Sequence, residues 1–326
     1  MNKAFDIKQF FLRDYLTIPI TVICFIWASV TINYFATPNN ILNIFIQMSD
    51  LLIISLGLMM VILNGGIDFS VTAVMGLGSI LGALVMNKTD GFLMDSPYGW
   101  LVGILIILAI GVAIGVINGI AVVYLKMPSF MATMATFLCF AGLALYIANS
   151  KPISNLPRNF LFIGNGWIFD IVPFPIIMAA VVVFIMYLVL HRSVYGRNVY
   201  AIGTNPQAAS ISGLPVKKTV FMLFIFSSVL AAIGGMITSA RLSASMPDLN
   251  KARLLDFVTV VIFGGTSPFG GKGTVLGTVI GAFFISMLSN ALSMMNLQWF
   301  DTMFIKGLFL LGIIVVTAIN AKRESI

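Results

Sequence analysis

Long apolar runs separated by short polar segments extend over almost the whole chain. Most runs hold about 20 residues, the length that an α-helix needs to cross the hydrocarbon core of a bilayer. The runs are continuous and do not alternate, so helices are predicted and not the strands of a closed barrel. The pattern predicts an all-α, polytopic membrane protein that forms a single domain, residues 1–326. About ten transmembrane segments are predicted, at 15–36, 45–64, 69–87, 100–124, 130–149, 174–191, 217–239, 256–265, 274–294 and 303–320.

Two places differ from simple spans. One apolar run stops at Asn64 and resumes after only a few residues, so no proper loop separates it from the next run. The segment 256–265 is too short to cross a bilayer at a rise of about 1.5 Å per residue. Both are interpreted as broken or half-length helices, which in transporters mark the substrate route. The helix breaks are placed at Gly65, Gly66, Gly264 and Gly265.

Composition and charge narrow the class further. The chain has 326 residues, of which 60% are hydrophobic and 9% charged, which is more apolar surface than a soluble fold can bury. The net charge of +7 comes from basic residues scattered at the ends of apolar runs. The positive-inside rule explains this charge better than nucleic-acid binding does, and it places both termini in the cytoplasm, with the polar residues 1–14 among them. The residue pattern indicates no metal site, no cofactor and no catalytic acid and base.

The segment 264–274 resembles a phosphate-binding loop only superficially. Lys272 is followed by Gly273 where Ser or Thr is needed, and Thr266 stands where the first glycine should be. ATP binding by this chain is therefore excluded. Any ATP-driven function requires a separate ATPase subunit.

The segment His191–Lys218 is a polar and basic island between two apolar runs. It shows no apolar face wide enough for a core, and the positive-inside rule places it in the cytoplasm. Asn205 is expected to cap a short helix over Pro206–Ser212, and Gly213 is expected to end that helix.

The small residues of this short helix suit docking. Ala208 and Ser212 share one face, and Ala209 and Gly213 lie on the neighbouring face. The resulting smooth surface fits a groove on another protein, so added bulk at Ala209 is expected to obstruct docking. An ordinary cytoplasmic loop with one helical turn is the alternative interpretation.

Three stretches, in the right order, make the chain resemble a known family. They are VILNGGIDFSV at 61–71, YGRNVYAIGTNPQAASISGLPVKK within the island, and the run from Asp256 through VIFGGTSPFGGKGTVLGTVIGA to Ala282. The chain resembles the permease subunits of ABC sugar importers, the group that serves ribose, galactoside, xylose and autoinducer-2. It departs from the family at Leu255 and Gln207, where Glu is usual or frequent, so the charge offered to a partner differs.

The resemblance implies a coupling loop at about 192–217 that docks on cytoplasmic ATP-binding subunits. It also implies a second permease copy or a paralogue, an extracytoplasmic sugar-binding protein, and a place in the lipid of the bacterial cytoplasmic membrane. The chain would form the channel for a monosaccharide or related small polar solute and would not be an enzyme. The residues assigned to ATPase coupling are Gly203, Asn205, Pro206, Gln207, Ala208, Ala209 and Gly213.

Polar residues near the two breaks are candidates for the substrate pathway. A carboxylate at membrane depth such as Asp68 is by default a functional hypothesis, although Asp68 also fits as the N-cap of a helix beginning at Phe69. The uncharged candidates would bond the hydroxyls of a sugar or, alternatively, bond between helices. The candidates are Asn64, Asp68, Ser70, Asn118, Asp256, Thr266 and Ser267.

An ion-coupled secondary transporter is the alternative function. Such a transporter would bury further carboxylates among its helices, and Asp68 is the only clear candidate in the sequence.

Glycines four residues apart mark the helix faces that approach closely, because helices in lipid pack mainly through small residues. Internal packing is favoured for each stripe, and one stripe is expected near a partner permease. The stripes are Gly78 and Gly82; Gly111, Gly115 and Gly119; and Gly273, Gly277 and Gly281.

Overall fold

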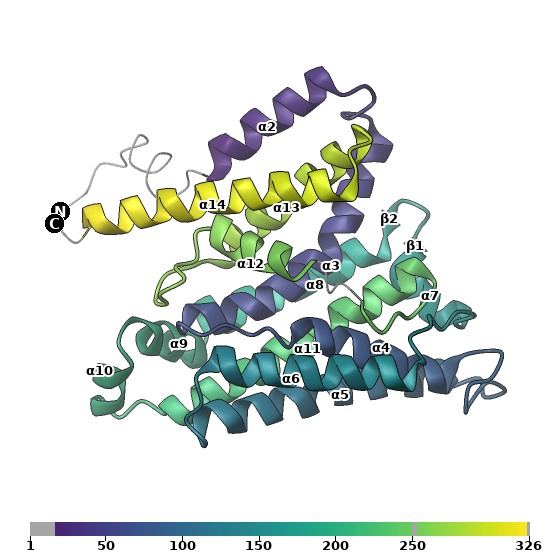
Figure 1. Cartoon of the computed structure of the whole chain (residues 1–326), viewed down its shortest axis with the longest axis horizontal. Helices are drawn as coiled ribbons and strands as arrows, with labels where there is room; N and C mark the ends of the chain where they lie inside the picture. Colours follow the sequence, from purple (N-terminus) through teal and green to yellow (C-terminus); the bar gives the residue numbers. More distant parts are fainter. Residues whose placement is uncertain (1–16, 250–252, 325–326) are drawn as a thin grey trace.

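A computed structural model of the chain describes residues 17–249 and 253–324, and the predicted cytoplasmic stretch 1–14 lies outside these ranges. A helix is found at each of the ten predicted segments (Figure 1). Six helices are long and apolar enough to cross a membrane, so the all-α, polytopic class is confirmed. The ten helices are α2 (Thr17–Thr31), α3 (Pro38–Leu63), α4 (Val71–Met86), α5 (Gly99–Val123), α6 (Ser129–Ile147), α8 (Phe174–Tyr187), α11 (Val216–Leu242), α12 (Leu254–Phe263), α13 (Val275–Met294) and α14 (Trp299–Glu324).

The six candidate spans are α3, α5, α6, α8 with the π-helical turn η2 (Leu188–Arg192), α11 and α13. The helices α2, α4 and α12 are apolar but shorter. At 26 residues, α3 is a full-length helix, so the half-length alternative is wrong for the run ahead of Asn64, whereas the helical backbone is interrupted over residues 64–70, at the predicted break. The half-length prediction holds for α12, which has 10 residues.

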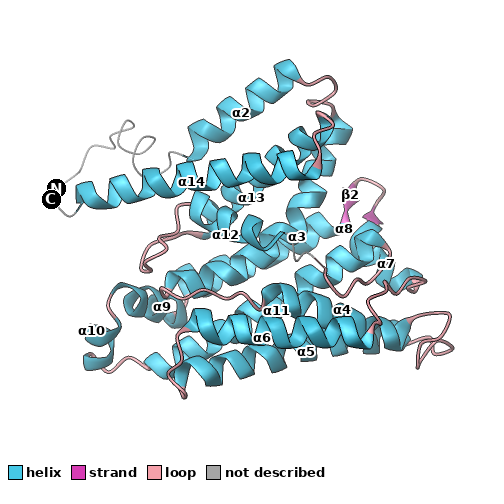
Figure 2. Ribbon diagram, viewed as in Figure 1, coloured by secondary structure: helices cyan, strands magenta, loops and turns pink. Residues whose placement is uncertain are grey.

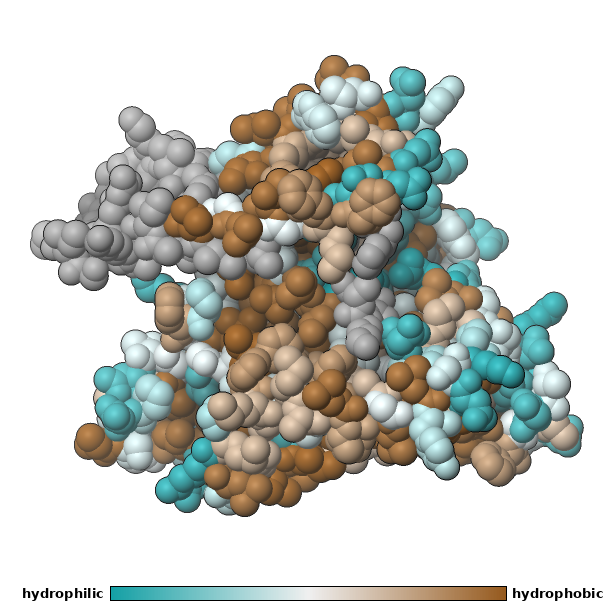
Figure 3. All heavy atoms as spheres, viewed as in Figure 1, coloured by the Kyte–Doolittle hydropathy of each residue, from teal (hydrophilic) through white to brown (hydrophobic). Residues whose placement is uncertain are grey.

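Helix α3 forms the centre of the bundle. Every residue from Met48 to Leu63 is buried, and α3 packs against α8, α11, α12 and α13. On its other side α11 packs against α4 and α5. Hydrophobic side chains cover the middle of the view in Figure 3, and hydrophilic ones gather toward its two ends, as expected for a bundle surrounded by lipid.

Several short elements were not predicted. Between α6 and α8 lie α7 (Arg158–Asn165) and a small hairpin of β1 (Trp167–Ile168) and β2 (Val172–Pro173) (Figure 2). Within the polar island, α9 (Val194–Thr204) precedes the predicted short helix α10 (Pro206–Ile211). The expectation that the island lacks a core face is wrong.

Helix α9 supplies that face. Val199 and Ile202 are buried, and Tyr195 packs its ring against Phe226 of α11 with 5.7 Å between ring centroids. These three positions follow the i, i+4, i+7 spacing of an amphipathic helix, a signal that was available in the sequence.

All three glycine stripes pack inside this chain. A Cβ at Gly111 would lie 2.9 Å from the Ser228 oxygen of α11, one at Gly82 would lie 2.9 Å from the Gly103 oxygen of α5, and one at Gly281 would meet the Val260 oxygen of α12. The internal-packing interpretation is therefore confirmed. The chain's own helices cover each stripe, and the position of one stripe near a partner permease stays a prediction.

Candidate functional site

A chain of buried hydrogen bonds surrounds Asp68, just ahead of α4. Its Oδ1 accepts from the backbone N–H of Ser70 at 2.9 Å and from Ser70 Oγ at 2.6 Å, and its Oδ2 accepts from Ser227 Oγ of α11 at 2.8 Å. Asn118 Nδ2 of α5 donates to Ser70 Oγ at 2.8 Å, and Thr136 Oγ1 of α6 donates to Asn118 Oδ1 at 2.8 Å. These bonds join the first break to three helices.

This geometry favours the structural alternative for Asp68, Ser70 and Asn118. All three are fully buried, they bond each other, and none lines the cavities described below. Helix α4 begins at Val71 and not at Phe69, so Asp68 lies too far ahead of α4 to be its N-cap residue, although its carboxylate bonds the N–H of Ser70, the residue that precedes the helix.

The exposed backbone of the break is satisfied by the start of α6. The N–H of Ile67 donates to Ser129 Oγ at 3.2 Å, and that of Phe69 donates to Thr133 Oγ1 at 3.2 Å. Side chains of a neighbouring helix thus replace the helical hydrogen bonds lost at the break.

Replacing Ser227 with alanine is expected to lower the stability of the folded protein by about 1–3 kcal/mol, because it removes a donor from a buried carboxylate. Thermal unfolding of the detergent-solubilised protein measures the loss. The matched control is Ser228→Ala, one residue along the same helix. Ser228 is equally buried, and its hydroxyl has no hydrogen-bond partner among the described residues. Equal melting temperatures for the two variants would contradict the stabilising role assigned to the hydrogen bonds around Asp68.

The two breaks, about 200 residues apart in the sequence, lie against each other. The N–H of Gly271 donates to the Leu63 carbonyl at 2.8 Å, and a Cβ on Gly65 would lie 3.5 Å from the carbonyl oxygen of Phe269. Thr266 and Ser267 lie in the glycine-rich loop of residues 264–274, between α12 and α13. Thr266 is buried, and Ser267 Oγ accepts from the N–H of Phe269 at 3.2 Å. No local pattern around the two glycine pairs indicated this contact.

The four break glycines differ in backbone conformation and in surroundings. Gly65 and Gly265 have positive φ angles of +72° and +84°, which other residues disfavour. Gly66 and Gly264 do not. A Cβ on Gly264 would lie 2.5 Å from the carbonyl oxygen of Gly277 in α13, so close approach excludes a side chain there. Asn64 ends α3, and its Oδ1 is buried without a partner in the described part of the chain.

Helix α9 rests on both breaks. A Cβ on Gly203 would collide with the Leu63 carbonyl and would lie 2.9 Å from the N of Gly271. Tyr200 Oη donates to the Gly273 carbonyl at 2.8 Å. Burial raises the pKa of Tyr200 to about 12, so this hydroxyl keeps its proton at physiological pH. The island is therefore tied to the end of α3 and to the loop that precedes α13.

The predicted cap and stop of the short helix are confirmed. Asn205 Oδ1 accepts from the N–H of Ala208 at 2.9 Å, Pro206 occupies the first helical turn, and Gly213 has a φ of +78°. The helix ends at Ile211, one residue before the predicted end.

The exposed face of α10 differs from the predicted one. Ala209 is only 5% exposed and packs against its own chain, so the expectation that it offers a docking surface is wrong. Gly203 is likewise directed at the breaks. Gln207, Ala208 and Gly213 are exposed, and Ile211 is 88% exposed at the end of the helix.

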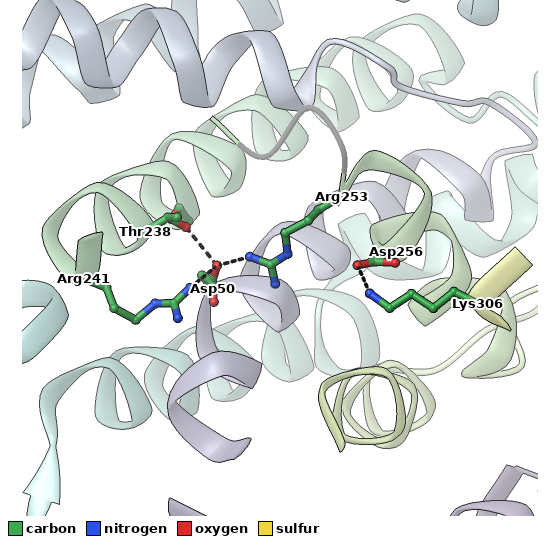
Figure 4. A network of polar contacts seen from close by, with 7 residues as sticks. Asp50, Thr238, Arg241, Arg253, Asp256 and Lys306 are labelled. Carbon is green, nitrogen blue, oxygen red and sulfur yellow. Dashed lines mark hydrogen bonds and ion pairs between the residues drawn. The ribbon is translucent and has the colours of Figure 1, made fainter. Parts of the chain in front are cut away.

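A second charged cluster was missed in the sequence. Asp50, fully buried in the middle of α3, accepts at its Oδ2 from Arg253 Nη1 at 2.8 Å and from Thr238 Oγ1 at 2.9 Å, with Arg241 Nη2 at 3.5 Å (Figure 4). Asp68 is therefore not the only carboxylate among the helices. We looked in the sequence for polar residues near the glycine breaks, and Asp50 has no such break beside it. A carboxylate inside a predicted span nevertheless indicates a buried polar contact by itself.

Beside this cluster, Asp256 of α12 pairs with Lys306 of α14, with 2.8 Å between Oδ2 and Nζ (Figure 4). Asp256 and Lys306 both line a cavity of about 430 Å³. Of the predicted pathway residues, Asp256 is the one that the structure places in the wall of this cavity. Thr266 and Ser267 lie in the loop of residues 264–274.

Residues 40–317 match the family model for the permease component of branched-chain amino acid transport systems. The chain belongs to this permease family. It is 35% identical to the ribose import permease protein RbsC of Bacillus subtilis, over 89% of this chain and 87% of the relative. It is 34% identical to RbsC of Haemophilus influenzae, over 94% and 93%, and 31% identical to the D-allose transport system permease protein AlsC of Escherichia coli, over 98% and 96%. No solved structure matches the chain.

The resemblance to ABC sugar-import permeases is therefore confirmed. The chain is a transmembrane permease component, and its family is not catalytic.

Proposed function

We propose that this chain forms half of the membrane channel of an ATP-driven importer for a monosaccharide or a related small polar solute. The observation that carries the proposal is the likeness to ribose and D-allose permeases over 94% and 98% of the chain. The likeness spans both glycine breaks, the island and the charged cluster. A second copy of the chain, or a paralogue, completes the channel, and an extracytoplasmic binding protein delivers the solute.

The proposed orientation follows from charge. With ten segments in the bacterial cytoplasmic membrane, both termini and the basic island face the cytoplasm, and the loop that carries Asp90 and Asp95 faces outward. This orientation puts α9, α10 and both glycine breaks on the cytoplasmic side. Asp50 and its partners then lie on the extracytoplasmic side of the breaks.

Coupling is proposed to run from α10 through α9 to the breaks. Separate ATP-binding subunits dock on the exposed face of α10, with Ile211 as the apolar anchor. Because α9 contacts Leu63, Gly271 and Gly273, a displacement of α10 reaches the end of α3 and the loop between α12 and α13. ATP binding thereby alternates the access of the channel between its two sides.

Uptake into reconstituted vesicles that hold this permease, its cognate ATPase and its binding protein tests the function. Radiolabelled D-ribose, D-allose, D-xylose and L-leucine are compared with and without ATP. ATP-dependent uptake of a sugar supports the proposal. Uptake of L-leucine alone would contradict the sugar assignment, and uptake driven by an ion gradient without ATP would favour the secondary transporter.

Replacing Ile211 with aspartate is expected to weaken association with the ATPase by about 30-fold, because it removes an apolar anchor worth roughly 2 kcal/mol. Co-purification with the ATPase and stimulated ATP hydrolysis measure the effect. The matched control is Ser210→Asp, which adds the same charge at the neighbouring exposed position. If the Ile211 variant inserts normally and still co-purifies with its ATPase, α10 is only a connector.

A further inference from the structure

An apolar cavity forms a groove between α3, α8 and α13. Its volume of about 380 Å³ falls in the range of small-molecule sites. The rim is open to the surroundings of the chain, because Phe184 and Leu276 are 63% and 60% exposed. Among the described residues of its wall, only Ser49 and Tyr187 have a polar side-chain group, and the Ser49 hydroxyl already donates to the Phe45 carbonyl at 2.9 Å. The groove therefore suits an apolar occupant and not a solute with many hydroxyl groups.

The length of the groove matches one acyl chain. The groove follows α8 from Ile176 to Tyr187, which is about 16 Å at a rise of about 1.5 Å per residue. One leaflet contributes about 15 Å of hydrocarbon, half of the core of a typical bilayer. Tyrosine rings commonly mark the boundary between hydrocarbon and head groups, as Tyr187 would do at this end of the groove. An acyl chain parallel to α8 therefore fits the groove from end to end.

Positive charge gathers at the Tyr187 end of the groove. Arg192 is exposed and follows Tyr187 by five residues, one turn of the π-helix η2. Helix α9 begins at Val194, so the positive end of its dipole lies next to Arg192. The ring of His191 packs edge-on against Tyr187 with 5.1 Å between centroids, and stacks on Tyr200 of α9 at 6.2 Å. This end of the groove is thus connected to α9 and presents a guanidinium and a helix N-terminus to an anion.

The elements around this end bring no carboxylate to Arg192. The sequence has no Asp or Glu at 171–247 or at 257–300, and these stretches contain all of α8, α9 and α13. Helix α3 has Asp50, which is buried against Arg253. A phosphate group can supply the negative charge that these elements lack.

A second copy of the chain is a poorer occupant than a lipid. Two copies that share a channel are related by a two-fold axis along the membrane normal, so one surface meets itself at the same depth. The Arg192 end of one copy would then meet the Arg192 end of the other, and like charges that face each other are unfavourable. A lipid phosphate neutralises this charge instead, and basic pockets between helices on the cytoplasmic side bind anionic head groups.

We propose that the groove holds one acyl chain of an anionic phospholipid from the cytoplasmic leaflet, with its phosphate at Arg192 and the N-terminus of α9. The site requires the proposed orientation, with Arg192 on the cytoplasmic side, but not the proposed solute. Because α9 also contacts both glycine breaks, the bound lipid steadies the segment that connects α10 to them.

Replacing Ala180 with tryptophan tests the groove. Ala180 is an exposed residue of its wall, so the indole takes up space that the acyl chain needs. The purified variant is expected to bind phosphatidylglycerol about tenfold more weakly, because methylene groups of the chain leave the groove. Native mass spectrometry of the lipid adducts measures the binding. The matched control is Val181→Trp, at the next position of α8, exposed but outside the wall, which is expected to bind normally.

Equal binding of phosphatidylglycerol by the two tryptophan variants overturns the inference. Loss of dimers in the Ala180→Trp variant with normal lipid binding also overturns it, because a second copy then occupies the groove. These measurements use the purified chain without ATPase or sugar, so their outcome is independent of the uptake experiments that test the proposed function.

Replacing Arg192 with glutamine tests the head group. The preference for phosphatidylglycerol over phosphatidylcholine is expected to fall by about fivefold, the typical contribution of one basic residue near anionic lipid. Lys217→Gln removes a charge from an exposed position at the start of α11 and is expected to leave the preference unchanged. Glycerol 3-phosphate, which has the phosphate but no acyl chain, is not expected to compete at the same concentration. Competition by glycerol 3-phosphate, or an unchanged preference in Arg192→Gln, overturns the inference.

A quenching measurement covers the case in which Ala180→Trp fails to insert. Ala180→Cys and Val181→Cys are made in a chain whose Cys24 and Cys139 are replaced by serine, and each is labelled with bimane in nanodiscs. Phosphatidylglycerol with brominated acyl chains is expected to quench the label at position 180 more than brominated phosphatidylcholine does, whereas the two lipids quench equally at position 181. Equal quenching by the two lipids at position 180 overturns the inference.

Discussion

Replacing Asp50 with asparagine is expected to destabilise the folded protein by about 3–5 kcal/mol, because it removes the charge that holds two guanidinium groups among the helices. The Asp50 side chain is fully buried, while those of Arg241 and Arg253 are 24% and 29% exposed. Asparagine keeps the size of the side chain and still accepts from Thr238, so the loss reports the charge. Membrane insertion yield and thermal unfolding in detergent measure it.

Two further variants identify the cause of this loss. Asp95→Asn removes a carboxylate from an exposed loop position and is expected to change stability little. Asp50→Asn combined with Arg253→Gln removes both charges of the closest pair, and is expected to be more stable than the sum of the two single variants allows. If the two single effects simply add, the charges of Asp50 and Arg253 are not coupled and the explanation fails.

Replacing Gly203 with valine is expected to lower ATP-driven uptake by about tenfold or more while the ATPase still binds, because loss of a typical coupling free energy has this magnitude. The added Cβ would collide with the Leu63 carbonyl and approach the backbone of Gly271. Helix α9 would then separate from the two breaks, although the exposed face of α10 is unchanged. Uptake and ATP hydrolysis, measured on the same vesicles, separate coupling from docking.

Ala201→Val is the matched control for this variant. Ala201 lies on the same helix two residues earlier and is exposed, so valine there meets no backbone of the breaks. Unchanged uptake by a well-inserted Gly203→Val protein would show that contact between α9 and the breaks does not transmit the movement of α10.

Local features of the chain were read correctly from the sequence. The ten helices follow from the length of each apolar run, since a lipid environment requires every backbone polar group to bond within its own helix. The cap at Asn205 and the stop at Gly213 also depend only on residues a few positions away. The motifs that indicated a sugar-import permease are likewise short runs of neighbouring residues.

The tertiary structure decided which faces of these elements are covered. In an apolar helix every face looks alike, so the sequence could not tell that α11 covers one glycine stripe or that Ala209 is buried. Asp50 forms an ion pair with Arg253, which lies 203 positions away in the sequence, and no local pattern predicts this pair. No local pattern predicts the contact between the two glycine breaks either, because hydrogen bonds and ion pairs between distant segments form only once the helices have packed.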